Sequence, residues 1–196
     1  LVGHSGHPEV VGTMGQLPKG SITLVEDLDQ IQALTPENPD NLAWVTQTTL
    51  SVDDTRHIVD ALKKKFPNIT GPHKDDICYA TTNRQEAVKQ VAPLVDALIV
   101  VGSSNSSNSQ RLREVAERVG CPITRLVLRA EEIDWPAFEG IRKLGLTAGA
   151  SAPEVLVEEI IEAFAARYDV IVDTVSTVVE DMVFPLPREL RSEAAE

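Results

Sequence analysis

The segment ALIVVGSSNSSNSQRLREVAERV, residues 97–119, places three patterns in a row. Residues 97–102 form a short apolar run, which is typical of a buried strand, and residues 103–109 form a polar loop. Residues 107–119 then carry apolar side chains at the i, i+3, i+4 and i+7 spacing of a helix. A strand, a polar loop and a helix in this order indicate a parallel sheet with crossover helices, so we expect an α/β fold.

The same order of strand, loop and helix recurs along the 196 residues of the chain. The predicted strands are β-rich runs at residues 1–4, 22–26, 42–46, 97–102, 124–128 and 144–147, with a further β-rich run at 170–179. The clearest predicted helices lie at residues 52–65, 84–91, 107–119 and 153–167. The FPLP motif at 184–187 then ends the part that we expect to be ordered.

A domain boundary is predicted at residues 66–74. Phe66, Pro67 and Asn68 end a helix, and a Gly-Pro pair at 71–72 turns the chain before a new strand, loop and helix begin. We therefore expect two parallel-sheet α/β domains, at residues 1–73 and 74–190, followed by a charged tail at 191–196.

The composition is that of an ordinary globular protein, with 42% hydrophobic and 24% charged residues. A formal charge of −12 argues against nucleic-acid binding, which requires clustered Lys and Arg. No apolar run approaches the ~20 residues that span a bilayer, and no signal-peptide pattern opens the chain, so we expect a cytoplasmic protein without a membrane partner. Nucleotide-binding glycine motifs are also missing from the sequence. A phosphate group would have to be bound by hydroxyls, amides and helix N-termini.

Several polar loops lie where the ligand site of an open α/β sheet is expected, beyond the carboxyl ends of the strands. They are HSGHPE (4–9), TQTT (46–49), SSNSSNS (103–109) and TAGASAP (147–153), and DDICYATTN (75–83) adds a thiol. Each loop taken singly is better explained by helix capping and turn formation. Taken together, the loops place uncharged donors at several helix N-termini, which favours a phosphorylated ligand.

Two residues of the first loop, His7 and Glu9, are candidates for chemistry. They stand two apart across a proline, so both can face one crevice, with His7 as a phosphate or hydroxyl donor and Glu9 as a general acid. The alternative is a surface loop followed by a first-turn Glu that the helix dipole favours. The residues alone do not separate these interpretations. His4 is interpreted as a structural residue at a strand end, and His57 and His73 as exposed residues without a role.

The two cysteines of the sequence have different surroundings. Cys78 fits a small buried hydrophobe, a reactive thiol near a helix start or a soft metal ligand, and one cysteine alone does not decide between them. Cys121, between a glycine and a proline, indicates a turn residue before a strand and is given no role. Neither a zinc pair nor a disulfide framework is expected.

The polar segments resemble the hallmark motifs of the 4-hydroxy-3-methylbut-2-enyl diphosphate reductase family. The similarity extends in order along essentially the whole chain. It is carried by GHPE (6–9) with GTMGQ (12–16), TQTTLSVDDT (46–55), DDICYATTNRQ (75–85), VGS (101–103), NSSNS (105–109), LTAGASAP (146–153) and FPLP (184–187).

The resemblance implies a trefoil of three α/β domains around a central 4Fe-4S cluster, with one cysteine ligand from each domain and the last two domains in this chain. Cys78 corresponds to the third of these ligands. Glu9 would deliver protons, and Thr48 would contact the hydroxyl region of the substrate. The diphosphate would be held by His7, Ser106, Ser107, Asn108 and Ser151.

The same resemblance implies a reaction of the non-mevalonate pathway of isoprenoid biosynthesis. In the family, 4-hydroxy-3-methylbut-2-enyl diphosphate loses its allylic hydroxyl by a two-electron, two-proton reduction, which gives isopentenyl and dimethylallyl diphosphates. The cluster carries the electron chemistry, and its free apical iron can bind the substrate oxygen. A ferredoxin or a flavodoxin would supply the electrons.

The chain departs from the family pattern at its amino-terminal side. It lacks the first domain, the opening strand and helix of the second domain, two cysteine ligands and two upstream histidines. Because one cysteine of the family type cannot supply three thiolates, we expect a fragment that is inactive by itself. Two other interpretations are a non-catalytic phosphate-binding module and a metal-free phosphosugar isomerase or lyase that uses Glu9 and His7.

Overall fold

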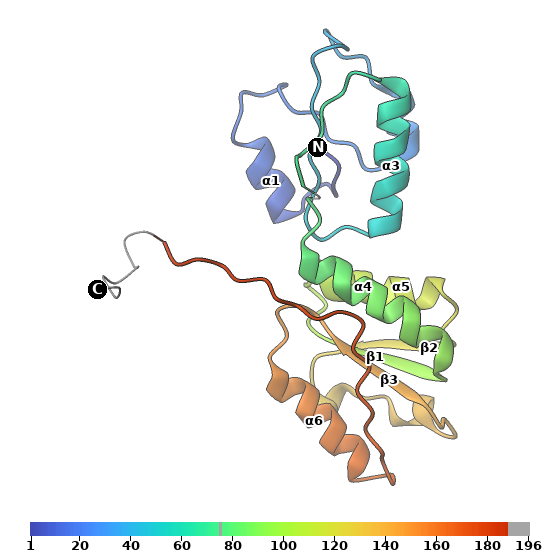
Figure 1. Cartoon of the computed structure of the whole chain (residues 1–196). Helices are drawn as coiled ribbons and strands as arrows, with labels where there is room; N and C mark the ends of the chain where they lie inside the picture. Colours follow the sequence, from blue (N-terminus) through green and yellow to red (C-terminus); the bar gives the residue numbers. More distant parts are fainter. Residues whose placement is uncertain (75, 188–196) are drawn as a thin grey trace, which may run out of the picture.

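A computed structural model describes residues 1–74 and 76–187 of the chain. Its largest regular feature is a three-stranded parallel sheet in the order β2-β1-β3 (Figure 1). The strands are β1 (Ala97–Val101), β2 (Ile123–Val127) and β3 (Leu144–Ala148). This parallel sheet with crossover helices confirms the α/β fold class.

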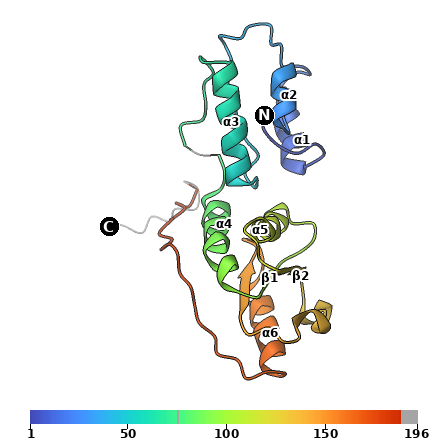
Figure 2. The same ribbon diagram turned by 90° about the vertical axis from the view of Figure 1, so that its right-hand side faces the viewer.

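Six α-helices accompany the sheet in the described residues (Figure 2). They are α1 (Pro8–Met14), α2 (Leu28–Ala33), α3 (Val52–Lys65), α4 (Tyr79–Val91), α5 (Ser107–Arg118) and α6 (Glu154–Ala165), and three short 3-10 helices lie at Ala92–Leu94, Ala130–Glu132 and Trp135–Phe138. None of the described helices is long and apolar enough to cross a membrane.

The central strand β1 is buried on both faces, as its continuous apolar run predicts. Ala97, Ile99 and Val101 pack with side chains of α6 in one core cluster. Leu98 and Val100 point the opposite way and pack with side chains of α4 and α5 in a second cluster. The sheet is therefore a middle layer between α6 on one face and α4 with α5 on the other (Figure 2).

A separate apolar core lies in residues 1–74. Val2, Val25, Ile31, Ile58 and Leu62 are among its buried members, and they come from the first segment of the chain, from α2 and from α3. Figure 1 shows this part stacked above the part that contains the sheet. The domain boundary predicted at residues 66–74, and with it the division into domains at 1–73 and 74–190, stays a prediction.

Three predicted strands of this first part are wrong as strands. Residues 1–4, 22–26 and 42–46 are joined only by isolated parallel bridges, from Val2 to Val25 and from Val2 to Thr46. Each pairing rests on two backbone hydrogen bonds, such as Gly3 N to Val25 O and Val25 N to Leu1 O. The pairing does not continue because His4 opens a turn in which its carbonyl accepts from His7 N.

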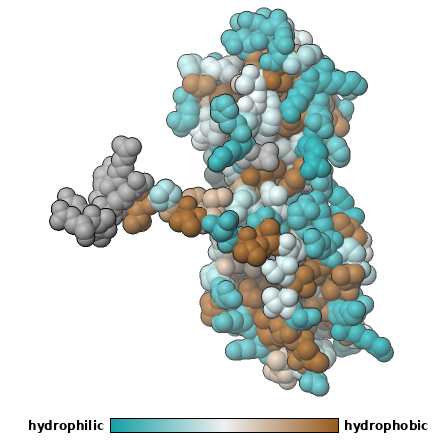
Figure 3. All heavy atoms as spheres, in the orientation of Figure 1, coloured by the Kyte–Doolittle hydropathy of each residue, from teal (hydrophilic) through white to brown (hydrophobic). Residues whose placement is uncertain are grey.

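The β-rich run at residues 170–179 is also not a strand. The segment is extended and belongs to no sheet of the described residues, and Ile171 and Val179 are 94% and 87% exposed. Figure 3 shows apolar side chains gathered over the lower half of this face of the molecule. Alternating β-branched residues favour an extended backbone, but a β-strand also needs a second strand at a sheet edge with which it can form hydrogen bonds. The predicted tail at 191–196 lies outside the described residues.

Helix α4 is longer than the sequence predicts. It begins at Tyr79, because Cys78 has a non-helical ψ of 132° at the N-cap and its carbonyl accepts from the N–H groups of Thr81 and Thr82. The first turn contains threonines and an asparagine, which have low helix propensity, so the pattern alone predicts a start at Arg84. The early start places Cys78 at the N-terminus of a helix.

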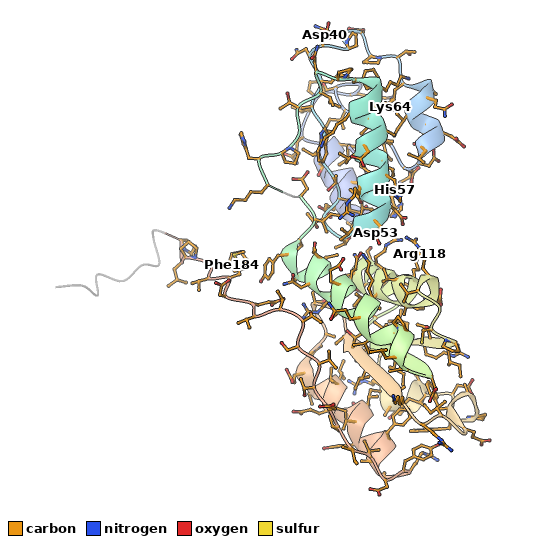
Figure 4. The ribbon with its side chains drawn as sticks, turned by 45° about the vertical axis from the view of Figure 1, so that its right-hand side comes forward. Asp40, Asp53, His57, Lys64, Arg118 and Phe184 are labelled. Carbon is orange, nitrogen blue, oxygen red and sulfur yellow. The ribbon has the colours of Figure 1, made fainter. Side chains whose placement is uncertain are left out.

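Charged pairs join α3 to the second part of the molecule. Arg118 donates two hydrogen bonds to Asp54, at 2.8 and 2.9 Å, and Lys89 contacts Asp53 at 2.8 Å. Figure 4 labels Asp53, at the start of α3, and Arg118, on α5, on the two sides of this junction. Burial alone would raise the pKa of Asp54, but hydrogen bonds from Arg118 and Ser51 outweigh it and hold that pKa below its ordinary value of 3.8. The pair therefore stays charged at neutral pH.

Gln85 makes a second, buried connection at the same junction. Its side chain is fully buried, donates to Leu50 O at 2.9 Å and accepts from Val52 N at 3.0 Å. We expect Gln85→Ala to lower the free energy of unfolding by about 2–4 kcal/mol, because two buried backbone groups lose their partners. Urea denaturation of the whole chain measures this change. Gln90→Ala, at an exposed position of the same helix, is the matched control, and an equal loss in both variants would contradict the assignment.

Candidate functional site

His7 and Glu9 are placed by the turn that follows the first buried segment. Gly6 has a φ of +79°, which is accessible to glycine at little cost, and His7 follows as the N-cap of α1. The His7 ring accepts from Glu9 N through Nδ1 at 3.3 Å, and Pro8 occupies the first helical position. Both residues are half-buried, which favours a site over a fully exposed loop.

The Glu9 carboxylate is bound to Thr48, a residue 39 positions away in the sequence. Thr48 N donates to Oε1 and Thr48 Oγ1 donates to Oε2, each at 3.0 Å. Two donors on one carboxylate fix its orientation. The structure thus brings together two residues that the sequence indicated separately, and it gives Glu9 a contact beyond the dipole of its own helix.

Cys78 is tied to the same group through the backbone. Its N–H donates to Thr48 O at 3.0 Å, so the start of α4 lies against the loop that holds Glu9. Its thiol is free and exposed, which excludes the buried hydrophobe among the interpretations of the sequence. Cys121 is buried instead, where its thiol donates to Ile123 O at 3.4 Å ahead of β2.

The thiol of Cys78 fits one ligand position of a metal site, but not a whole site. In residues 1–74 and 76–187, no group of three or more His, Cys, Asp or Glu side chains could hold a metal ion. An exposed thiol at a helix N-terminus is accessible to a metal ion, and iron binds cysteine in its thiolate form. The remaining ligands of any cluster would have to come from other residues.

A second group of candidate residues lies at the N-terminus of α5. Ser106 is the N-cap, and its Oγ accepts from Ser109 N at 3.3 Å and lies 3.0 Å from Ser109 Oγ. Asn108 is only 7% exposed, yet its amide oxygen and nitrogen find no hydrogen-bond partner in the described structure. Because buried amides are normally paired, this one is a candidate to bind a ligand.

Two glycines let the strand ends approach this helix. A Cβ at Gly102, after β1, would lie 2.3 Å from Ser109 Oγ, and a Cβ at Gly149, after β3, would lie 2.2 Å from the same atom. The Cβ position at Gly149 is also 3.8 Å from the amide nitrogen of Asn108. The loop after β3, which carries the exposed Ser151, therefore lies beside the N-terminus of α5.

The two groups touch each other through residues that the sequence did not nominate. Arg111, on α5, places Nη2 3.0 Å from Nε2 of His4, in the turn before His7. Gln47 is buried and joins His4 N to Thr49 Oγ1. The adjacent motif residues Thr46 and Thr48 could have drawn attention to Gln47, but no local signal points to Arg111. His57 and His73 are exposed, as predicted.

A pocket of the described structure lies beside the candidate site but is not lined by it. Its volume is about 480 Å³, and its lining includes His4 and Arg111 together with Asp54 and His57. The nominated residues do not line it. The pocket lies between α2, α3 and the first segment of the chain.

The fold and the candidate site together define an α/β protein. Its loops beyond the strands carry uncharged hydrogen-bond donors, the Glu9 carboxylate bound by Thr48, and the exposed thiol of Cys78. Comparison with known proteins assigns the chain to a family. Residues 1–165 match the family described as LytB protein, so the chain belongs to the LytB family.

Individual relatives agree with this assignment. The chain is 68% identical over 195 residues to a 4-hydroxy-3-methylbut-2-enyl diphosphate reductase of Beijerinckia indica, and 69% identical over 191 residues to one of Methylocella silvestris. These alignments cover 100% and 97% of this chain, but 61% and 60% of the relatives. The chain thus spans about three fifths of the length of the curated relatives that it matches.

A solved structure supports the same family. It is that of the E-1-hydroxy-2-methyl-but-2-enyl-4-diphosphate reductase from Plasmodium falciparum. The two chains share 37% sequence identity and superpose with a TM-score of 0.77, over 82% of this chain and 50% of the other. The resemblance inferred from the sequence motifs is therefore confirmed at the level of the family and the fold.

Proposed function

We propose that this chain is the substrate-binding part of an iron–sulfur reductase that converts 4-hydroxy-3-methylbut-2-enyl diphosphate to isopentenyl and dimethylallyl diphosphates. The names of its relatives supply the substrate. The observation that carries the proposal is the buried, unpaired amide of Asn108 at the N-terminus of α5. A diphosphate oxygen could accept hydrogen bonds from its Nδ2 and from the N–H groups of that helix end.

The diphosphate would be bound almost without cations. The chain carries a net charge of −12, and the nominated ligands are hydroxyls, an amide and the ring of His7. Such donors work when they are fixed beforehand at a helix N-terminus, where the dipole adds positive potential. The proposed diphosphate ligands are His7, Ser106, Ser107, Asn108 and Ser151.

Glu9 and Thr48 would act at the other end of the substrate. Thr48 holds both carboxylate oxygens of Glu9 through its N–H and its hydroxyl, which fixes the direction in which Glu9 can pass a proton. The departing allylic hydroxyl needs a proton to leave as water, and a carboxylic acid within hydrogen-bond reach can supply it. We assign proton delivery to Glu9 and contact with the substrate hydroxyl to Thr48.

Cys78 would provide one thiolate to a 4Fe-4S cluster. When bound, the cluster would supply the electrons of the reduction, which a ferredoxin or a flavodoxin would deliver to it in the cytoplasm. The backbone hydrogen bond from Cys78 N to Thr48 O would keep the thiolate close to Glu9, because Thr48 also binds the Glu9 carboxylate. The other thiolates would come from the part of the relatives that this chain does not span, in a trefoil to which this chain contributes two lobes.

One observation favours a second candidate, a non-catalytic phosphate-binding module. Within the described residues, a single exposed thiol and no cluster of metal-binding side chains are present. Both candidates require diphosphate binding, so iron content separates them and diphosphate affinity does not.

Titration of the whole chain with inorganic diphosphate, followed by calorimetry, tests the binding site that both candidates share. We expect diphosphate to bind at least about tenfold more tightly than orthophosphate, because the second phosphate adds acceptors for the same row of donors. Sulfate is the control for unspecific anion binding. Equal, weak affinity for all three anions would contradict the proposed site.

A further inference from the structure

We propose that His4 and Arg111 form a positioning pair that holds the loop of His7 and Glu9 against the diphosphate-binding end of α5. The inference rests on the proposed function, because it concerns how the two halves of that site are kept together. It gives roles to two residues for which the sequence motifs suggested none.

Arg111 lies on α5, one turn beyond Asn108. Its Nη1 is paired with Glu114 on the same helix, and its Nη2 lies 3.0 Å from His4 Nε2. A guanidinium has donors and no acceptor and stays protonated, so this contact is a hydrogen bond only if His4 accepts through an unprotonated Nε2. In such a hydrogen bond the ring proton of His4 lies on Nδ1.

His4 is held on its backbone side as well. His4 N donates to Gln47 Oε1 at 3.0 Å, and Gln47 Nε2 donates to Thr49 Oγ1 at 2.9 Å. Gln47 is 1% exposed, and Gly3, next to His4, leaves no room for a Cβ beside Val10. These contacts fix the backbone of His4. A hydrogen bond to its ring can therefore hold the His4 turn at a defined place on α5.

A continuous series of contacts then leads from α5 to the chemistry-bearing residues. The carbonyl of His4 accepts from His7 N at 3.2 Å, and the ring of His7 accepts from Glu9 N. Glu9 is in turn fixed by Thr48. Arg111 is the contact in this series that comes from the second part of the molecule. Other contacts also join the two parts, but this one links the turn before His7 directly to α5, the helix that carries Asn108.

The test is calorimetric titration of inorganic diphosphate into the whole chain and four variants. We expect His4→Leu and Arg111→Met each to weaken binding about fivefold, which is the size expected for one partly exposed, charge-assisted hydrogen bond. His4→Gln should retain near wild-type affinity, because its amide oxygen can accept from Arg111. Arg113→Met makes the same chemical change at an ion-paired position of the same helix and should leave the affinity unchanged.

The double variant, His4→Leu with Arg111→Met, separates a pair from two independent effects. A true pair predicts that the double variant binds no more weakly than either single variant. Additive losses, wild-type affinity in both single variants, or a His4→Gln variant as weak as His4→Leu would each overturn the proposal. Thermal unfolding of every variant shows whether a lost affinity reflects a lost fold.

Nitrogen NMR of the His4 ring shows which ring nitrogen carries the proton, and it tests the contact with Arg111 without any ligand. The proposal predicts a proton on Nδ1 at neutral pH and a mixture of ring forms in Arg111→Met, whereas a protonated Nε2 in the wild type would overturn it. If the wild-type chain binds no diphosphate, the proposed function fails. The ring form of His4 then still supports or overturns the contact with Arg111.

Discussion

Cys78→Ala should abolish iron binding in a protein in which the amino-terminal part of the Beijerinckia indica relative is joined ahead of Leu1. In that joined protein, Cys78 would be one of three thiolates on the cluster, and a cluster that loses a protein thiolate is rarely retained. The exposed thiol at the start of α4, directly beside Thr48, is the reason for expecting this residue to be the ligand. Iron and sulfide analysis after anaerobic preparation measures the result.

Cys121→Ala in the same joined protein is the matched control. Cys121 is buried and donates to Ile123 O, so it faces away from solvent and from any shared cluster. The variant should keep its iron and show only a small loss of stability. Retention of iron by Cys78→Ala, or its loss only in Cys121→Ala, would contradict the assignment of the ligand.

Asn108→Leu should weaken diphosphate binding about a hundredfold, because it removes the only side-chain amide of the proposed anion site and buries an apolar group at the helix end. The same change should leave the free energy of unfolding unchanged or raise it. An unpaired buried amide is costly, and an apolar side chain of similar size removes that cost. Loss of binding without loss of stability identifies a residue that is kept for a ligand.

Ser104→Ala, at an exposed position in the same loop, serves as the control. It should bind diphosphate as the wild type does. Calorimetry and urea denaturation of the three proteins give both quantities. A destabilised Asn108→Leu variant with normal diphosphate affinity would show that Asn108 is a structural residue, and the site would then have to be placed elsewhere.

The sheet of the second part could be predicted from sequence because its signals are local. An unbroken apolar run marks β1, and the periodicity after it marks α5, so both were located nearly to the residue. The first part was harder, since its described extended segments pair through isolated bridges, two at Val2 and one between Ala43 and Thr70. Pairing at single residues depends on neighbours that a local pattern does not contain. The run at 170–179 shows the opposite case, in which strong β propensity meets no sheet edge.

The candidate site likewise has features that could be predicted from the sequence and features that could not. The polar loops could be predicted because chemistry in α/β folds gathers beyond the strand ends, and the family motifs named their residues. The contact between Glu9 and Thr48, and that between His4 and Arg111, join residues 39 and 107 positions apart. Contacts over such separations follow from the packing of whole elements. The sequence pattern therefore indicated Glu9 and Thr48 without their pairing, and it gave no signal for the contact between His4 and Arg111.

Anaerobic turnover by the joined protein tests the central claim most directly. The protein would be supplied with 4-hydroxy-3-methylbut-2-enyl diphosphate and a chemical one-electron reductant, and the products would be separated and identified. The account predicts isopentenyl and dimethylallyl diphosphates from the joined protein and no conversion by the present chain alone. A joined protein that holds its cluster and binds diphosphate, yet leaves the substrate unchanged, would contradict the account.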